Sequence, residues 1–515
     1  MKKFVRCLLI ALILPIALMC GGCAINEDGA VSIKDIKKTD SVGVVDTYTI
    51  TYTNGKTSQF SIVNGEDGEN LYTNITINDL YNQVKGSKPE GYDLIDFIDE
   101  YLDIQIDTSA IASAKALRSA VSIFVEHEVD IVDYNNIISY TNTPYGPQAN
   151  YGVKQSIIWG AGAGVIYQLD KQAGDAYIIT NYHVCFSNDA KASDGIATKF
   201  TTYLYGGESI DLADLTYLSY YNSNCKDYGY LFDNYDAKGI PVVNYGYGAV
   251  EAEYVGGSEL YDIAVLKVTN SDVIKNSDCI EAEVYDSDLV TAGSSAIAVG
   301  NPDAAGIAVT NGVVSVDSEY ISVQISDSSV TLREFRIDTP VNSGNSGGGL
   351  FDGFGRLVGI VNAKTADTSI ENMSYAIPSN IATRVAQSII DNCDGTNRKT
   401  NRVLLGITLN TINSKAHYDE TSGLMRIKET VSISYIEGSS LASDIGLKTG
   451  DVISSVEIIN TNGTTVIETD RLFKIVDAML LVREGDCIKI NYVRNLVAGS
   501  VATNALTAEN FISVR

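Results

Sequence analysis

The feature of this 515-residue chain that most limits its fold is a long series of short apolar segments separated by glycine-rich turns. The series runs from about residue 115 to about residue 380, and segments of that kind indicate β-strands rather than helices. The composition agrees, because the chain holds 31 tyrosines and 44 glycines against only 8 prolines. We therefore expect a mainly β protein with a large all-β domain in its middle.

One of the three histidines stands out as a candidate catalytic base. His183 ends an apolar strand, residues 176–184, where a side chain can be both fixed and reachable. His127 and His417 lie in polar stretches, and His417 is in a turn-like one. Acyl transfer at neutral pH needs a nucleophile, a base that takes its proton and an acidic group that orients the base. His183 is the histidine that we predict to be that base.

A glycine-rich loop and a buried carboxylate supply the other two parts. Ser346 lies in the loop at residues 342–349, where glycines permit tight turns and let a substrate carbonyl approach closely. Asp262 precedes an apolar strand, and a carboxylate there is costly to bury without a partner such as an imidazolium. The backbone N–H groups of the serine loop could form an oxyanion hole. Its predicted members are Gly344, Asn345 and Ser346.

The blocks around these residues, at 180–184, 262–267 and 344–348, resemble the signature blocks of the HtrA/Deg family of trypsin-like serine proteases. The order along the chain is histidine, aspartate, serine, as in chymotrypsin-like enzymes. Further matches in the family's order are at 160–165, 300–302, 375–379 and Asp338.

The resemblance implies a chymotrypsin-like domain of two perpendicular six-stranded β-barrels, with the triad in the cleft between them. His183 would be the general base, Asp262 its orienting group and Ser346 the nucleophile of an acyl-enzyme mechanism. The chain departs from the family at Ser343 and Gly349, where proline is frequent, so we expect a more flexible serine loop. By analogy the substrate pocket, which would favour small or medium apolar side chains, comprises Pro340, Val341 and Asn342.

The C-terminal segment has a different pattern. Residues 402–407 resemble the carboxylate-binding loop of PDZ domains, and residues 440–453 resemble the helix and turn of PDZ domains on HtrA proteases. Such a module adds a peptide as an extra β-strand. The alternative is a purely structural role. The resemblance implies that the peptide would contact Leu404, Leu405, Gly406 and Ile407.

The sequence of the N-terminus indicates a targeting segment. A basic start is followed by an apolar run too short to span a bilayer, and the run ends at two cysteines. This resembles a bacterial lipoprotein signal at residues 1–22, with Cys23 as the lipidated residue because Gly22 precedes it. A cleaved signal with free secretion is the alternative. Both place the protein outside the cytoplasm, and lipidation would anchor it to the membrane.

The remaining organisation follows from turns and helical spacing. We predict a tether, a β-hairpin module turning at Asn54-Gly55, and a helical spacer with two short helices within 75–104. An amphipathic helix at 379–390 closes the protease domain, and a tyrosine-rich insertion near 211–247 is a packed embellishment or an aromatic exosite. The predicted ranges are 23–40 for the tether, 41–70 for the hairpin, 71–112 for the spacer, 113–395 for the protease and 396–515 for the α+β PDZ domain.

These patterns predict an ATP-independent serine endopeptidase that cleaves misfolded or exposed polypeptides at the cell envelope. Its partners would be polypeptides with apolar or unfolded segments, and relatives in the HtrA family suggest a homotrimer. A formal charge of −27 and a pI of about 4.4 argue against nucleic-acid binding, and we expect neither a cofactor nor a metal. The alternative function is that of a binding protein without catalytic activity. The presence of all three triad residue types argues against this alternative.

Overall fold

The computed structural model describes residues 33–42, 45–53, 55–63, 108–208, 212, 215, 231–237, 240–325, 328–362, 373–392, 400–420 and 422–514. The chain divides into two units, Met1–Ile106 and Asp107–Arg515, and each is described here by itself. Cys23, the short helices predicted within 75–104 and most of the tyrosine-rich insertion lie outside the described residues.

The N-terminal unit contains a three-stranded antiparallel sheet in the order β1-β2-β3. The predicted hairpin is present, because β2 pairs with β3 around a turn in which Gly55 has a φ of +79°. The first strand is an addition, since it overlaps residues 23–40, for which we predicted only a polar tether. The strands are β1 (Ile33–Val42), β2 (Val45–Tyr52) and β3 (Thr57–Val63).

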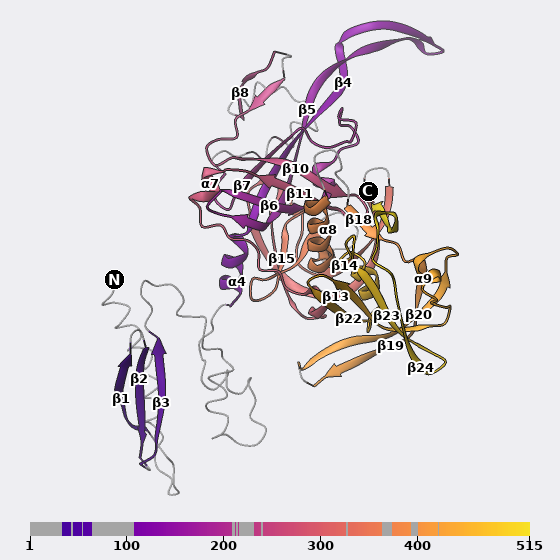
Figure 1. Ribbon diagram of the computed structural model, residues 1–515. Coiled ribbons are helices and arrows are strands. Elements are labelled where there is room, and N and C mark those ends of the chain that lie inside the picture. The colour runs from indigo at the N-terminus through magenta and orange to yellow at the C-terminus, as the bar shows by residue number, and fades with distance from the viewer. Residues whose placement is uncertain are drawn as a thin grey trace. The chain divides into compact units, whose positions relative to one another are not determined.

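The second unit contains two closed barrels of six strands each, which confirms the mainly β, chymotrypsin-like fold class (Figure 1). The first barrel has the order β10-β11-β6-β5-β4-β7 and the second has the order β12-β13-β14-β17-β16-β15. The first is built from β4 (Ala120–Thr143), β5 (Gly146–Asp170), β6 (Asp175–Thr180), β7 (Lys199–Leu204), β10 (Val250–Ser258) and β11 (Ile263–Val268). The second is built from β12 (Ser295–Gly300), β13 (Ala308–Ile325), β14 (Ser328–Ile337), β15 (Gly349–Phe351), β16 (Leu357–Asn362) and β17 (Ser374–Pro378).

Helix α8 (Ser379–Asn392) packs against both barrels, and it includes all residues of the helix predicted at 379–390. Its apolar residues lie in one buried cluster with Val265 of the first barrel and Ile297 of the second. Burying such side chains stabilises the fold by roughly 1.5–3 kcal/mol each. Helix α4 (Thr108–Leu117) adds Ala112 and Ala116 to the same cluster, so both barrels share one core.

Strands β4 and β5 continue beyond the first barrel as a long two-stranded arm, which projects from the domain in Figure 1. The arm carries several exposed large apolar side chains, and at residues 131–154 its only charged residues are Asp133 and Lys154. Tyr145, at its tip, is fully exposed. A two-stranded sheet, β8 (Phe232–Tyr235) and β9 (Pro241–Val243), lies in the part of the chain between β7 and β10.

The C-terminal part forms a separate sheet with the order β19-β20-β21-β23-β24, in which β22 also pairs with β21. A short pair, β18 with β25, accompanies it, and Val403, Val431 and Ile475 lie in its buried core. The elements are β18 (Thr400–Val403), β19 (Ile407–Asp419), β20 (Leu424–Ile436), α9 (Leu441–Asp444), β21 (Val452–Asn460), β22 (Gly463–Glu468), α10 (Leu472–Ala478), β23 (Cys487–Arg494), β24 (Val497–Ala502) and β25 (Phe511–Val514).

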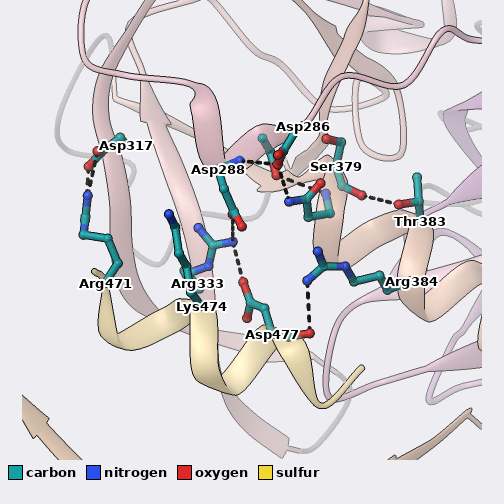
Figure 2. A network of polar contacts seen from close by, with 12 residues as sticks. Asp286, Asp288, Asp317, Arg333, Ser379, Thr383, Arg384, Arg471, Lys474 and Asp477 are labelled. Atoms are coloured by element: carbon teal, nitrogen blue, oxygen red, sulfur yellow. Dashed lines mark hydrogen bonds and ion pairs between the residues drawn. The ribbon is translucent and has the colours of Figure 1, made fainter. Parts of the chain in front are cut away.

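A polar network holds helix α10 against the second barrel (Figure 2). Arg333 of β14 donates from Nη2 to Asp477 Oδ2 of α10 at 2.6 Å, and both side chains are buried. Arg384 of α8 donates to the Asp477 carbonyl at 3.1 Å, and Arg471 pairs with Asp317 of β13 at 2.9 Å. The guanidinium of Arg333 also lies 3.9 Å from the ring centroid of Phe473. Barrel and C-terminal sheet are therefore joined by buried charge pairs as well as apolar contacts.

Candidate active site

The turn before β11 presents a buried carboxylate in a strained conformation. Asp262 has no exposed surface and a φ of +50°, in the left-handed region that costs a non-glycine residue on the order of 1 kcal/mol or more. Its backbone N–H donates to the carbonyl of Glu259 at 3.3 Å, and its carbonyl accepts from Asn181 Nδ2 at 2.8 Å. These bonds fix the carboxylate relative to the end of β6.

His183 lies directly against that carboxylate. It is on the one-turn helix α5 (Tyr182–Cys185), which begins two residues after β6 ends. The imidazole Nδ1 is 2.7 Å from Asp262 Oδ2, and the backbone N–H of His183 donates to Asp262 Oδ1 at 3.0 Å. Because Asp262 holds Nδ1, the ring nitrogen left for a reacting group is Nε2.

The loop that carries Ser346 is tied to both barrels. The Ser346 carbonyl accepts from the N–H of Ala163 on β5 at 2.8 Å, and the N–H of Gly347 donates to the carbonyl of Val361 on β16 at 3.0 Å. Gly344 has a φ of +91°, and a Cβ there would lie 2.1 Å from the carbonyl oxygen of Asn301. The loop therefore requires glycine at position 344 for both backbone conformation and space.

His183 and Ser346 line the same pocket, which has a volume of about 340 Å³. Ser343 and Gly344 contribute to it from the serine loop. Since Asp262 is bonded to His183, the structure brings all three predicted triad residues into one neighbourhood. The remaining lining comes from the first barrel, from α5 and from the two residues after it: Val125, His127, Ile158, Gly160, Ala161, Val184, Phe186 and Ser187.

The three residues predicted to form the oxyanion hole differ in whether their backbone N–H groups are already hydrogen-bonded. The N–H of Asn345 donates to the carbonyl of Asn342 at 3.1 Å, so it is engaged within the loop. Among the hydrogen bonds of the described residues, the N–H groups of Gly344 and Ser346 donate to no acceptor. Two of the three predicted groups are therefore available to a substrate oxygen, and Asn345 is not.

The predicted substrate-pocket residues lie apart from this pocket. None of Pro340, Val341 and Asn342 lines it. Pro340 is exposed, and its carbonyl accepts from Thr310 Oγ1 of β13 at 2.8 Å. The analogy that named these three residues therefore describes a different surface from the one that the pocket provides.

A sequence model of the trypsin-like peptidase domain matches residues 162–360 of this chain. The serine protease Do-like HtrA of Lactococcus lactis subsp. cremoris (strain MG1363) is 25% identical over 406 residues, which cover 76% of this chain and 82% of that protein. The protein is a serine endopeptidase, and the match to the trypsin-like domain covers residues 162–360.

Other relatives of the protease carry related names. The serine protease Do-like HtrB of Bacillus subtilis (strain 168) is 25% identical over 356 residues, which cover 68% of this chain and 64% of that protein. Among solved structures, the HtrA-type protease AlgW with decapeptide covers 77% of this chain and 97% of its own, at 21% identity and a TM-score of 0.40.

Two buried polar residues of the protease were missed from the sequence. His127, interpreted as part of a polar stretch, is only 4% exposed, and burial lowers its pKa to about 4. Glu334 of β14 has no exposed surface, and its Oε1 accepts from Asn362 Nδ2 at 2.9 Å. The signal for His127 was strand alternation, because Val125 and Val129 occupy the flanking inward positions of β4.

Burial makes Glu334 an acid that stays protonated at neutral pH. Its Oε2 is buried and accepts no hydrogen bond from any residue that the structure describes. Burial raises the pKa of Glu334 to about 8, the hydrogen bond from Asn362 opposes this, and the nearby charge of Asp262 adds to it. A carboxyl group is therefore kept neutral within electrostatic range of the residue that orients His183.

The loop predicted to bind a peptide carboxylate joins β18 to β19 in the C-terminal part of the protease. Gly406 has a φ of +72°, and a Cβ there would lie 2.3 Å from Cβ of Ser440. Leu405 is buried in the C-terminal core, Leu404 is 45% exposed, and Ile407 begins β19 at the end of the sheet order. Among the described residues, the N–H groups of Leu405 and Gly406 donate to no acceptor.

The described part of the chain contains neither a metal-binding cluster nor a helix suited to span a membrane. No group of three or more His, Cys, Asp or Glu side chains is placed to hold a metal ion. The described helices include none long and apolar enough to cross a membrane.

The raised pKa of Glu334 predicts that the stability of the folded protein depends on pH. With a folded-state pKa of about 8 against an ordinary value of 4.5, the folded state binds this proton more tightly than the unfolded state does. The free energy of unfolding therefore falls as pH rises from 4.5 to about 8. Replacing the acid in Glu334→Gln should remove this loss, on the order of a few kcal/mol at the upper end. Thermal unfolding at several pH values should show the variant's gain in Tm growing between pH 5 and pH 8.

The matched control is Glu251→Gln, which makes the same change at an exposed position of β10. Its Tm should follow that of the wild type at every pH. A Glu334→Gln gain that is independent of pH would contradict the assignment of the buried proton to Glu334.

Proposed function

We propose that the protease hydrolyses polypeptides with His183, Asp262 and Ser346 as its catalytic triad. The observation that carries the proposal is the pair of hydrogen bonds from His183 to the Asp262 carboxylate, at the rim of a pocket that Ser346 also lines. A base held by a buried acid beside a reachable serine is the arrangement that acyl transfer needs.

The first half of the reaction forms an acyl-enzyme. His183 Nε2 takes the proton of the Ser346 hydroxyl as its oxygen attacks the scissile carbonyl carbon, and Asp262 stabilises the resulting imidazolium. The same imidazolium then gives its proton to the departing amine as the carbon–nitrogen bond breaks. In the second half a water molecule loses a proton to His183 as its oxygen attacks the acyl carbon. The bond between that carbon and the Ser346 oxygen then breaks, the imidazolium returns the proton to this oxygen, and the new carboxyl end is released.

The oxygen that becomes negative during attack would be held by backbone N–H groups. Gly344 and Ser346 are the donors that we assign, because their N–H groups bond to no acceptor in the described part of the chain. Removing one such donor typically costs about 10²- to 10³-fold in kcat. The hydrogen bond of Asn345 inside the loop helps to keep the two donors in place.

The substrates that we propose are misfolded or exposed polypeptides at the cell envelope. The active-site pocket is lined by both apolar and polar groups. The relatives are named serine proteases of the HtrA type, a family whose members cleave polypeptides without ATP, and the described protease domain has the two closed barrels that the resemblance implies. We therefore propose that cleavage is independent of ATP.

A fluorophosphonate probe tests the catalytic assignment directly. The wild type should be labelled at Ser346, and Ser346→Ala should lose both labelling and peptidase activity. Loss of a triad member lowers kcat by on the order of 10⁴-fold or more. Mass spectrometry of labelled peptides and a casein-cleavage assay provide the measurements.

Ser343→Ala is the matched control, because it removes a hydroxyl from the same loop three positions away. It should still be labelled. A wild type that resists the probe while binding unfolded chains would favour the rival function, a binding protein without catalysis.

We further propose that the C-terminal part binds peptides as a PDZ domain. The support is a glycine loop with free N–H groups, followed by β19 at the end of its sheet. The C-terminal carboxylate of a peptide would bind at the loop of residues 404–407, and the peptide would pair with β19 as an additional strand.

Gly406→Ala tests this loop without removing the domain. The new Cβ meets Ser440 and the backbone is strained at a φ of +72°, so the loop must shift. Cleavage of long unfolded substrates should fall several-fold, whereas hydrolysis of short peptides should change less. Gly446→Ala is the control, because Gly446 also has a positive φ, of +84°, but open space around its Cβ position. Equal losses on long and short substrates would contradict peptide delivery by this loop.

The location at the membrane is also a proposal, and it rests on the sequence at Cys23. Cells grown with an alkyne-tagged fatty acid should incorporate the tag into the wild type and into Cys20→Ser. A Cys23→Ser variant should lack the tag and leave the membrane fraction, because two acyl chains are what hold such a protein stably. Tagging that depends on Cys20 instead would contradict the assignment.

A further inference from the structure

His127 occupies an inward position of β4 where the strand otherwise carries aliphatic residues. Val121, Ile123 and Val125 point into the core of the first barrel, and Val129 is buried as well. Alternation along the strand puts His127 on the same side, and only 4% of it is exposed. An imidazole therefore replaces the aliphatic side chain that this row would favour.

The Nδ1 atom of His127 is buried and has no hydrogen-bond partner in the described structure. An unsatisfied buried polar atom costs on the order of 1–3 kcal/mol. Ile158, its pair on β5, and the neighbouring pocket residues Val184 and Phe186 offer hydrocarbon only through their side chains. His127 Nδ1 therefore lowers the stability of the fold, because no described residue offers it a hydrogen bond.

The same histidine lines the pocket that holds Ser346 and His183. The ring that carries the unpaired, buried Nδ1 therefore borders the place where a substrate would lie. Because burial lowers the pKa of His127 to about 4, the ring is neutral throughout the neutral pH range. A neutral imidazole can donate or accept one further hydrogen bond but brings no charge to the pocket.

The pocket's position indicates which part of a substrate would reach His127. A peptide bond held at Ser346 has an acyl side and a leaving-group side, and His183 gives its proton to the amine that leaves. His183 lines this pocket together with Val184 and Phe186, which follow it in the chain. We therefore assign the space beside His127 to the leaving-group side.

We propose that His127 is a specificity-determining residue, which hydrogen-bonds an uncharged polar side chain of the substrate on the leaving-group side of the scissile bond. The inference rests on the proposed serine-protease function of this site. Serine, threonine, asparagine and glutamine carry the groups that fit. An aliphatic residue would leave Nδ1 unpaired, and a charged residue would lose its hydration without finding an opposite charge.

The test compares variants of the full-length protein on peptides that differ only in the residues after the cleaved bond. The wild type should cleave peptides with one of the four polar residues at one such position about tenfold faster in kcat/KM than peptides with leucine there. His127→Leu should abolish or reverse this ratio, and His127→Gln, which keeps a polar end, should restore part of it.

Thermal unfolding separates a binding role from a structural one. Replacing an unpaired buried imidazole by leucine should leave the Tm of His127→Leu equal to or above that of the wild type. Val129→Ala, a change at the next inward position of β4 and outside the pocket lining, should lower the Tm and keep the wild-type ratio.

Two results would overturn the assignment of His127: a wild type with no polar preference at any leaving-group position, or a His127→Leu variant that keeps the wild-type ratio. Fluorophosphonate labelling of Ser346 distinguishes these from failure of the underlying function. A labelled wild type with an unchanged ratio in His127→Leu refutes the role of His127 alone. An unlabelled wild type refutes the triad on which that role depends.

Discussion

The contact between the Asp262 carboxylate and His183 is the interaction on which the active-site arrangement depends. Both oxygens of the carboxylate are engaged by His183, one by the ring and one by the backbone N–H. The turn that supplies the carboxylate is held in a left-handed conformation by Asn181, which immediately precedes α5. Acid and base are thus fixed within the first barrel, and the serine loop is brought to them by its bonds to Ala163 and Val361.

The sequence predicted the parts of the fold that depend on local pattern. Short apolar segments and glycine turns predicted a mainly β domain, and the resemblance of the three motif blocks to HtrA/Deg proteases implied two barrels and the neighbourhood of His183, Asp262 and Ser346. The hairpin at Asn54-Gly55 and the helix at 379–390 were equally local, since turn chemistry and amphipathic spacing define them. Strand β1 was missed because its polar, lysine-rich sequence has little apolar alternation.

The predictions that failed depended on three-dimensional neighbours. His127 and Glu334 lie in segments that look polar, and only the closed barrels reveal that both are buried. The residues at 340–342 were chosen by position relative to Ser346 and stay a prediction, whereas the pocket that Ser346 lines joins the serine loop to residues of the first barrel far earlier in the chain. The engaged N–H of Asn345 depends on a turn geometry that its sequence does not specify. Burial and loop geometry of this kind arise from packing between distant segments.

The network around Asp477 has a consequence for how the molecule can be dissected. Truncation before the C-terminal sheet would remove Asp477, the nearer of the two carboxylates beside Arg333, and losing one partner of a buried ion pair is far more damaging than replacing both. It would also remove Leu480, which is buried in the core that α8 shares with both barrels. The two halves are therefore interdependent in stability, and an isolated catalytic half would differ from the intact enzyme in more than the loss of a peptide-binding surface.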